Sequence, residues 1–117
     1  MKFLDAPGPE FWPGVGESQP DSAELAGYLR AGHVLFASMG CVEDVLGSGE
    51  SVLGGGSLLT DGEWVWPGVL AFYVDRYRFP LPEAFVVHVR AAGYRVPVVA
   101  GERLAELTEG VRSGPSG

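Results

Sequence analysis

The segment that most restricts the fold is 57–66, where the pair Asp61-Gly62 stands between two alternating apolar runs. Asp-Gly is favoured in two-residue type I′ turns, because both central residues of that turn need a positive φ. The sequence therefore predicts a β-hairpin over 57–66. Closure through two residues places Thr60 opposite Glu63, Leu59 opposite Trp64, Leu58 opposite Val65, and Ser57 opposite Trp66. One face then carries Leu59, Trp64 and Trp66, and we expect it to pack under helices.

Helical patterns occupy four other segments. Asp21-Ser22-Ala23-Glu24 has the form of a capping box, and Pro67 suits a first helical position because it has no N–H to leave unpaired. Pro82 begins another helical pattern in the same way, and Gly93 ends it. Apolar residues at helical spacing predict helices over 22–31, about 67–77, Pro82 to Gly93, and about 102–112.

Strand patterns are shorter. The apolar run 33–39, bounded by glycines, predicts a buried strand, whereas 41–46 is compatible with either a strand or a turn of helix. Residues 47–51 are expected to form a loop, and 54–56 a flexible point or a bulge. Residues 94–99 resemble an edge strand, because Pro97 cannot donate to a central ladder.

The order of these elements is typical of the α+β class. We expect a small antiparallel sheet that includes the 57–66 hairpin, with helices mainly on one face. A doubly wound fold is excluded by the tight hairpin and by the absence of regular alternation between strands and helices.

Length and composition predict one domain. The chain has 117 residues, too few for two separate cores. Residues 1–20 are expected to form an extended arm, since 5–20 contain four prolines and three glycines, and Phe11 and Trp12 are expected to anchor it. Residues 21–112 form the domain in this interpretation, and 113–117 a disordered tail.

The charge is strongly negative and unevenly distributed. Eight basic residues stand against 15 acidic ones, for a net charge of −7. Lys2 and Arg30 face ten carboxylates in residues 1–63, whereas six arginines face five carboxylates in the remainder. Nucleic acid and anionic membranes both require a basic surface, so neither is an expected partner. A basic protein would be attracted.

Motifs that carry chemistry are largely missing. Cys41, His33 and His88 are too few and too far apart in sequence for a zinc site, and no metal or cofactor is expected. Glu43 and Asp44 would raise the pKa of a neighbouring thiol, so Cys41 is interpreted as a small buried core residue rather than a nucleophile. The glycine-rich stretch 47–56 lacks the lysine of a phosphate-binding loop.

The remaining candidate site residues are carboxylates and aromatic side chains. The carboxylate pairs Glu43/Asp44 and Asp61/Glu63 are interpreted first as solvated turn charges. The aromatic side chains are expected to fill the core. This set comprises Trp64, Trp66, Phe72, Tyr73, Tyr77, Phe79 and Phe85.

One segment carries a resemblance. Leu59-Thr-Asp-Gly-Glu-Trp-Val-Trp-Pro67, followed by Leu70-Ala-Phe-Tyr-Val74, Tyr77, Leu81-Pro82 and Phe85, resembles a group of small uncharacterised proteins, chiefly from actinobacteria. Their common pattern is LTDGxWVWxxxLxYYVxxYxxxLPxxF, and the match spans roughly residues 33–97. Val69 departs from it, since a polar residue is expected there. The resemblance assigns no catalytic residue. In size and composition the chain is also similar to bacterial toxin-immunity proteins.

These observations favour a non-catalytic protein that binds a protein partner, as an immunity protein binds its toxin. The expected partner surface joins carboxylates to one aromatic anchor. Its residues are Glu43, Asp44, Glu50, Asp61, Glu63 and Trp64. The alternative is a small ligand-binding protein or enzyme with an aromatic-lined pocket. A homodimer through 94–99 is a further alternative. One cysteine and no visible signal peptide favour the cytoplasm.

Overall fold

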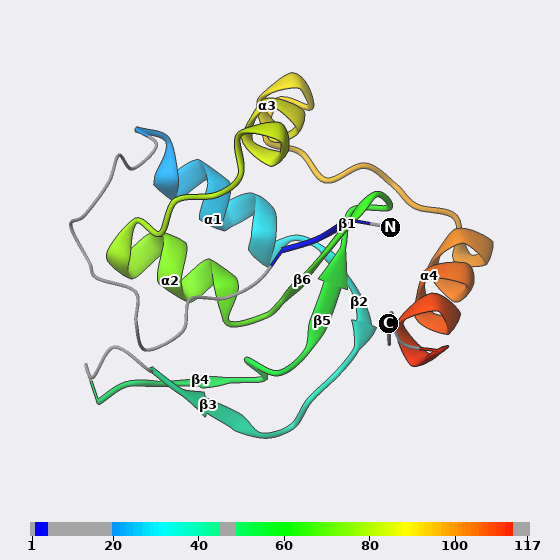
Figure 1. The fold of residues 1–117 in the computed structure, drawn as a ribbon, viewed down its shortest axis with the longest axis horizontal. Helices are drawn as coiled ribbons and strands as arrows, with labels where there is room; N and C mark the ends of the chain where they lie inside the picture. Colours follow the sequence, from blue (N-terminus) through cyan, green and yellow to red (C-terminus); the bar gives the residue numbers. More distant parts are fainter. Residues whose placement is uncertain (1, 5–19, 45–48, 114–117) are drawn as a thin grey trace.

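The computed structural model describes residues 2–4, 20–44 and 49–113, with side chains as far as residue 110 (Figure 1). These residues form four helices and a small, mostly antiparallel sheet, so the predicted α+β class is confirmed. Phe11 and Trp12, the expected anchors of the arm, lie outside the described residues, as does the tail from residue 114.

The main sheet has four strands in the order β1-β6-β5-β2. β1 (Lys2–Phe3) lies parallel to β6 (Trp64–Pro67), and β5 (Leu58–Thr60) lies antiparallel both to β6 and to β2 (His33–Phe36). The strand predicted over 33–39 is therefore present but ends earlier. A β-bulge interrupts the pairing of β2 with β5 after Val34.

The predicted hairpin is present as β5 and β6, but its register differs from the prediction. Leu59 lies opposite Trp66 and Thr60 opposite Val65, so the connection has four residues instead of two. Gly62 has φ 103°, whereas Asp61 does not have a positive φ, which excludes a type I′ turn. Since the register is shifted by two residues, Leu59 and Trp66 still share the predicted face.

A separate two-stranded ribbon consists of β3 (Cys41–Glu43) and β4 (Ser51–Leu53). Residues 41–43 thus form a strand, one of the two alternatives for 41–46. β4 was not predicted, because the sequence around it has the composition of a loop. Residues 54–56 form a turn, in which Gly54 has φ 73°.

The helices are α1 (Ser22–Arg30), α2 (Leu70–Tyr77), α3 (Glu83–Ala91) and α4 (Gly101–Ser113). α1, α2 and α3 gather on one side of the main sheet, as predicted, while α4 lies on the other side and contacts β2 (Figure 1). The core lies between the first three helices and the sheet. Its largest fully buried side chains are Trp66, Tyr28, Tyr73 and Phe85.

One expected helix start is wrong, and the capping box expected at the start of α1 is absent. Pro67 is the last residue of β6 and lies opposite Leu58, and α2 begins three residues later. The backbone N–H of Gly68 donates to the Ser57 carbonyl at 2.7 Å, which holds the chain against the sheet before it turns into α2. Asp21 precedes α1 but makes no side-chain cap, since its carboxylate is bound by Arg90 and Tyr94.

The predicted edge strand over 94–99 is also absent. Tyr94 has φ 62°, a left-handed conformation that turns the chain as it leaves α3, and 95–100 continue without regular structure. The imidazole Nε2 of His33 lies 2.9 Å from the Pro97 carbonyl oxygen, so a side chain rather than a strand ladder contacts this connection. The alternative of a homodimer through 94–99 assumed a strand there, and these residues do not form one.

Candidate functional site

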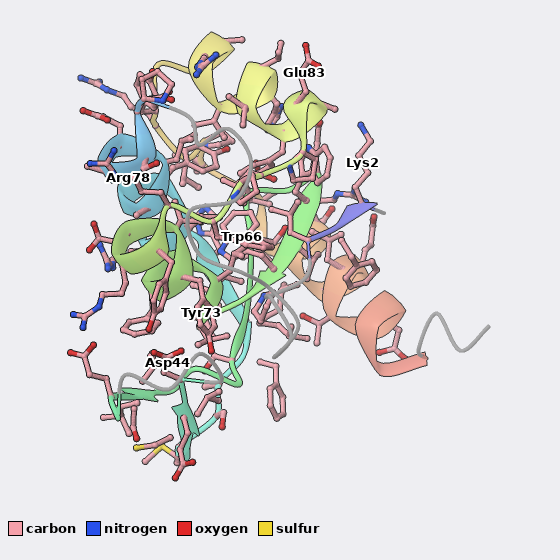
Figure 2. All side chains as sticks on the ribbon, turned by 60° about the vertical axis from the view of Figure 1, so that its left-hand side comes forward. Lys2, Asp44, Trp66, Tyr73, Arg78 and Glu83 are labelled. Atoms are coloured by element: carbon pink, nitrogen blue, oxygen red, sulfur yellow. The ribbon has the colours of Figure 1, made fainter. Side chains whose placement is uncertain are left out.

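The six residues expected to form one partner surface lie in two separate regions. Glu43, Asp44 and Glu50 belong to the ribbon, whereas the other three belong to the tip of the β5–β6 hairpin. In Figure 2, Asp44 lies at one end of the molecule and Lys2 near the other. The ammonium of Lys2 is 5.2 Å from the ring centroid of Trp64, which fixes the hairpin tip at that far end.

Asp61 is the centre of the hairpin tip. Its side chain accepts the backbone N–H groups of Glu63 and Trp64 at 3.0 and 2.8 Å. Its second oxygen accepts the Tyr28 hydroxyl at 2.6 Å and lies 2.8 Å from Nε2 of His88. One carboxylate thus shapes its own turn and also ties that turn to α1 and α3. Only 3% of Asp61 is exposed, so its interpretation as a solvated turn charge is wrong.

The protonation of this cluster follows from its contacts. Burial alone would raise the pKa of the Asp61 carboxyl, but the hydrogen bonds from Tyr28, from two backbone N–H groups and from His88 outweigh it. The pKa of Asp61 therefore lies below its ordinary value. Because an ionised carboxylate can only accept, His88 donates its Nε2 proton to it. Burial, followed by the bond to Asp61, raises the pKa of the Tyr28 hydroxyl.

The other two residues of the tip have different surroundings. Trp64 is buried and packs edge-on against Phe85, with ring centroids 5.2 Å apart, so it offers little surface to a partner. Glu63 is exposed, and its carboxylate lies 3.7 Å from Nδ1 of His88. His88 joins α3 to the hairpin. The arrangement holds α1, α3 and the hairpin together.

At the ribbon, the three carboxylates are also unlike one another. Asp44 is buried and accepts a hydrogen bond from the Tyr77 hydroxyl of α2, so it is not the solvated charge expected. Glu50 is exposed and pairs with Arg76 at 3.1 Å. Glu43 is exposed on β3.

Cys41 is exposed, which contradicts the expectation of a buried core thiol. The ribbon alternates, with Cys41 and Leu53 on its outer face and Val42 and Val52 facing inward. The alternation was visible in the sequence, but which face is covered depends on the elements around the ribbon.

A groove of about 620 Å³ runs between β4 and the α1–α2 pair. It is open to solvent, and two of its apolar side chains are well exposed, Val34 by 57% and Leu53 by 76%. Arg30 and Glu50 contribute charge at its rim. The groove residues are Leu29, Arg30, Val34, Glu50, Ser51, Val52, Leu53, Gly54, Ser57, Leu59, Gly68, Ala71 and Phe72.

The large aromatic side chains of the core pack together and fill it. Tyr28, Trp66 and Phe85 are packed against one another, with ring centroids 5.8–6.1 Å apart, and are fully buried. A smaller hollow of about 360 Å³ lies beside Phe3 and Phe79. Its apolar lining carries no cluster of polar groups.

Within residues 2–4, 20–44 and 49–113, no helix has the length and apolar character needed to cross a bilayer. In the same part of the chain, no three His, Cys, Asp or Glu side chains gather in a way that could hold a metal ion.

Comparison of the chain with protein-family models, with curated proteins and with solved structures finds no match.

Sequence reasoning missed the groove and the Tyr28–Asp61 bond for different reasons. The groove depends on β4, whose residues resemble a loop. The bond joins residues 33 positions apart in the sequence. A sequence can suggest such a bond in one way, because a tyrosine hydroxyl that becomes buried needs a hydrogen-bond acceptor.

Proposed function

We propose that the chain is a non-catalytic protein that binds a protein partner through the groove between β4 and the α1–α2 pair. The observation that carries this proposal is the exposure of Val34 and Leu53 beside that groove. Apolar side chains surrounded by charged ones are the usual make-up of a protein interface with a dry centre and a polar rim.

Charge favours a basic partner. A second hollow, of about 280 Å³, shares Glu50 and Ser51 with the groove. Together with the ion-pair partners of Arg30 and Glu50, the groove and this hollow are bordered by four carboxylates and two arginines, for a local net charge of −2. These groups are Arg30, Glu43, Asp44, Glu50, Asp75 and Arg76. The whole chain carries −7, so a basic protein would be attracted from a distance and its encounter rate would fall with salt.

The proposal revises the surface expected from the sequence. Glu43 and Glu50 remain in the proposed surface, whereas Asp44 is buried next to them. Asp61 and Trp64 leave it because their side chains are buried in the hairpin tip, and Glu63 leaves it because it lies at that tip. We further propose that the protein acts in the cytoplasm as an immunity protein, in keeping with its small size and acidic composition.

Affinity capture tests the proposal. The tagged protein is exposed to a lysate of its native host at low and high salt, and the captured proteins are identified by mass spectrometry. We expect one basic protein in stoichiometric amount at low salt and less of it at high salt. The same capture is repeated with the groove variant Val34→Ser/Leu53→Ser.

A matched control variant is Val87→Ser/Val98→Ser, which removes two exposed apolar side chains outside the groove. The control should retain the partner and the groove variant should lose it. No capture at either salt concentration, or equal capture by both variants, would reject the proposed function.

A further inference from the structure

The ribbon has a defined hydrogen-bonding pattern. The Gly54 N–H donates to the Gly40 carbonyl at 2.8 Å, and the Asp44 N–H donates to the Glu50 carbonyl at 3.0 Å. Since Val42 lies opposite Val52, midway between these pairs, it belongs to the same hydrogen-bonded set. Ser51 and Leu53 lie between such pairs, so their N–H and C=O groups point away from β3.

The outer edge of β4 is therefore a row of main-chain donors and acceptors. Within the parts of the chain that the structure describes, the outward groups of Ser51 and Leu53 have no hydrogen-bond partner. Both residues line the groove, which places this edge beside an apolar surface instead of in open solvent. A strand edge that is neither paired nor covered is a ready template for another strand.

The edges of β2 and β3, within the described residues, have surroundings different from those of the β4 edge. α4 contacts β2 at the edge of the main sheet, and His33 of β2 lies against the Pro97 carbonyl. The outer edge of β3, at Cys41 and Glu43, does not line the apolar groove. The edge of β4 thus combines outward main-chain groups with the apolar walls of the larger groove.

We propose that an extended segment of the partner protein adds to β4 as a third strand, bonding through its main chain to Ser51 and Leu53. This inference rests on the proposed function and names how the groove would hold its partner. Alternate side chains of the added strand would enter the groove against Leu59 and Phe72, and the intervening ones would lie on the outer face of the ribbon, which carries Glu43. The segment therefore alternates apolar and basic residues.

Charge argues against a second copy of the chain as the occupant. Pairing β4 with the β4 of another copy would bring two Glu50 side chains to one interface between molecules that each carry −7. A basic segment would instead meet complementary charge. Self-association is nevertheless an outcome that the experiment must be able to report.

The test begins with a library of random twelve-residue peptides displayed on phage, selected on the wild-type protein and counter-selected on the groove variant. We expect enriched peptides that alternate apolar and basic residues. The best peptide is synthesised in three forms, one unmodified and two N-methylated at alternate residues, each on one of its two edges. Methylation of the edge facing β4 should weaken binding at least tenfold, the effect of losing one or two main-chain hydrogen bonds.

The protein side of the same bond is tested with Ser51→Pro, which removes the outward N–H, and Ser51→Ala, which retains it. The proline variant should bind the peptide at least tenfold more weakly and the alanine variant should bind normally. Hydrogen exchange at Ser51 and Leu53 should slow when the unmodified peptide binds wild type. If Ser51→Pro fails to fold, the methylated peptides and the exchange data decide the question.

The outcomes separate this inference from the proposed function. In one outcome the groove variant loses the lysate partner while a folded Ser51→Pro variant captures it normally. That outcome supports binding in the groove and overturns strand addition. Normal capture by both the groove variant and the Ser51→Pro variant overturns both proposals. Failure to enrich any peptide, equal binding of all methylated forms, or a dimer of the protein alone that Ser51→Pro disrupts would each overturn the addition of a partner strand.

Discussion

The hairpin tip and the ribbon are two β-strand regions rich in carboxylates, yet the structure uses them in opposite ways. At the tip, α1 and α3 cover Asp61, and its carboxylate becomes the shared acceptor of four described donors. At the ribbon, one face remains exposed, and Glu43 and Leu53 lie on it. The same residue types therefore stabilise the fold in one region and remain available for binding in the other.

This contrast leads us to expect large effects on stability at the tip and small ones at the ribbon. The tip joins three elements through buried groups, and removing one of these groups leaves the others without partners. The ribbon is two three-residue strands with only Val42 and Val52 facing inward.

The largest effect is expected for Asp61→Ala. The Tyr28 hydroxyl and the Trp64 N–H would then be left buried without an acceptor, and the free energy of unfolding should fall by about 3–5 kcal/mol. Urea unfolding followed by tryptophan fluorescence measures this change. Glu63→Ala, an exposed carboxylate two residues away, is the control and should cost less than about 0.5 kcal/mol. A loss under 1 kcal/mol for Asp61→Ala would remove the distinction between the two regions.

The next effect compares two glycines, Gly32 at the contact between the end of α1 and the sheet, and Gly27 on the exposed face of α1. A Cβ at Gly32 would lie 2.6 Å from the Trp66 ring and 3.0 Å from Leu59, whereas one at Gly27 meets nothing within 4 Å. Gly32→Ala should therefore lower the free energy of unfolding by about 1–3 kcal/mol. Gly27→Ala, inside α1, should raise it by about 0.5–1 kcal/mol. Thermal unfolding measures the change in stability for both variants. If both substitutions raised the free energy of unfolding, or both lowered it, the packing of Gly32 against Trp66 would be contradicted.

A smaller, pH-dependent effect is expected at Asp21. The hydrogen bond from Arg90, opposed by burial and helped by Tyr94, lowers the pKa of the Asp21 carboxyl from 3.8 to about 2. Because the folded pKa lies below the unfolded one, this carboxylate stabilises the fold above pH 4, and its contribution disappears between about pH 4 and 2. Asp21→Asn should cost about 1 kcal/mol at pH 7.

Urea midpoints of wild type and Asp21→Asn, measured from pH 7 to pH 2, test this expectation. The difference between the two proteins should shrink as the pH falls through the window from 4 to 2. A difference that stays constant over the whole range would show that the charge of Asp21 does not contribute to folding.

The smallest effect on stability is expected at the outer face of the ribbon. Leu53→Ser should change the free energy of unfolding by less than about 0.5 kcal/mol, since the side chain is largely exposed. Cys41 on the same face should react with a thiol reagent in the native protein at a rate close to that in denaturant. A native reaction slowed by a hundredfold or more would mean that this face is covered.

The sequence predicted the elements whose pattern was local and strong. α1, α3 and α4 lie within two residues of their expected bounds, and the β5–β6 hairpin lies where its turn pair indicated. The predictions from sequence were wrong where a contact between distant residues replaced the expected local contact. Asp21 binds Arg90 instead of capping α1, and Asp61 satisfies its own turn and two distant side chains, which lengthens the connection.

The candidate site was predicted less well than the fold. Burial of Asp44, Asp61 and Trp64 depends on which helix covers each of them, and nothing near these residues in the sequence reports it. Glu43 and Glu50 are exposed, as a partner surface requires, but the apolar side chains beside them went unrecognised because β4 resembles a loop.

What the sequence determined by itself is the alternation of side chains, because the period of a strand or helix depends only on local geometry. Leu59 and Trp66 therefore share a face despite the shift in register. What only the tertiary structure decided is which faces are covered, since burial is a relation between elements far apart in the chain. That relation buries Asp61 against Tyr28 and His88, and leaves the edge of β4 beside an open groove.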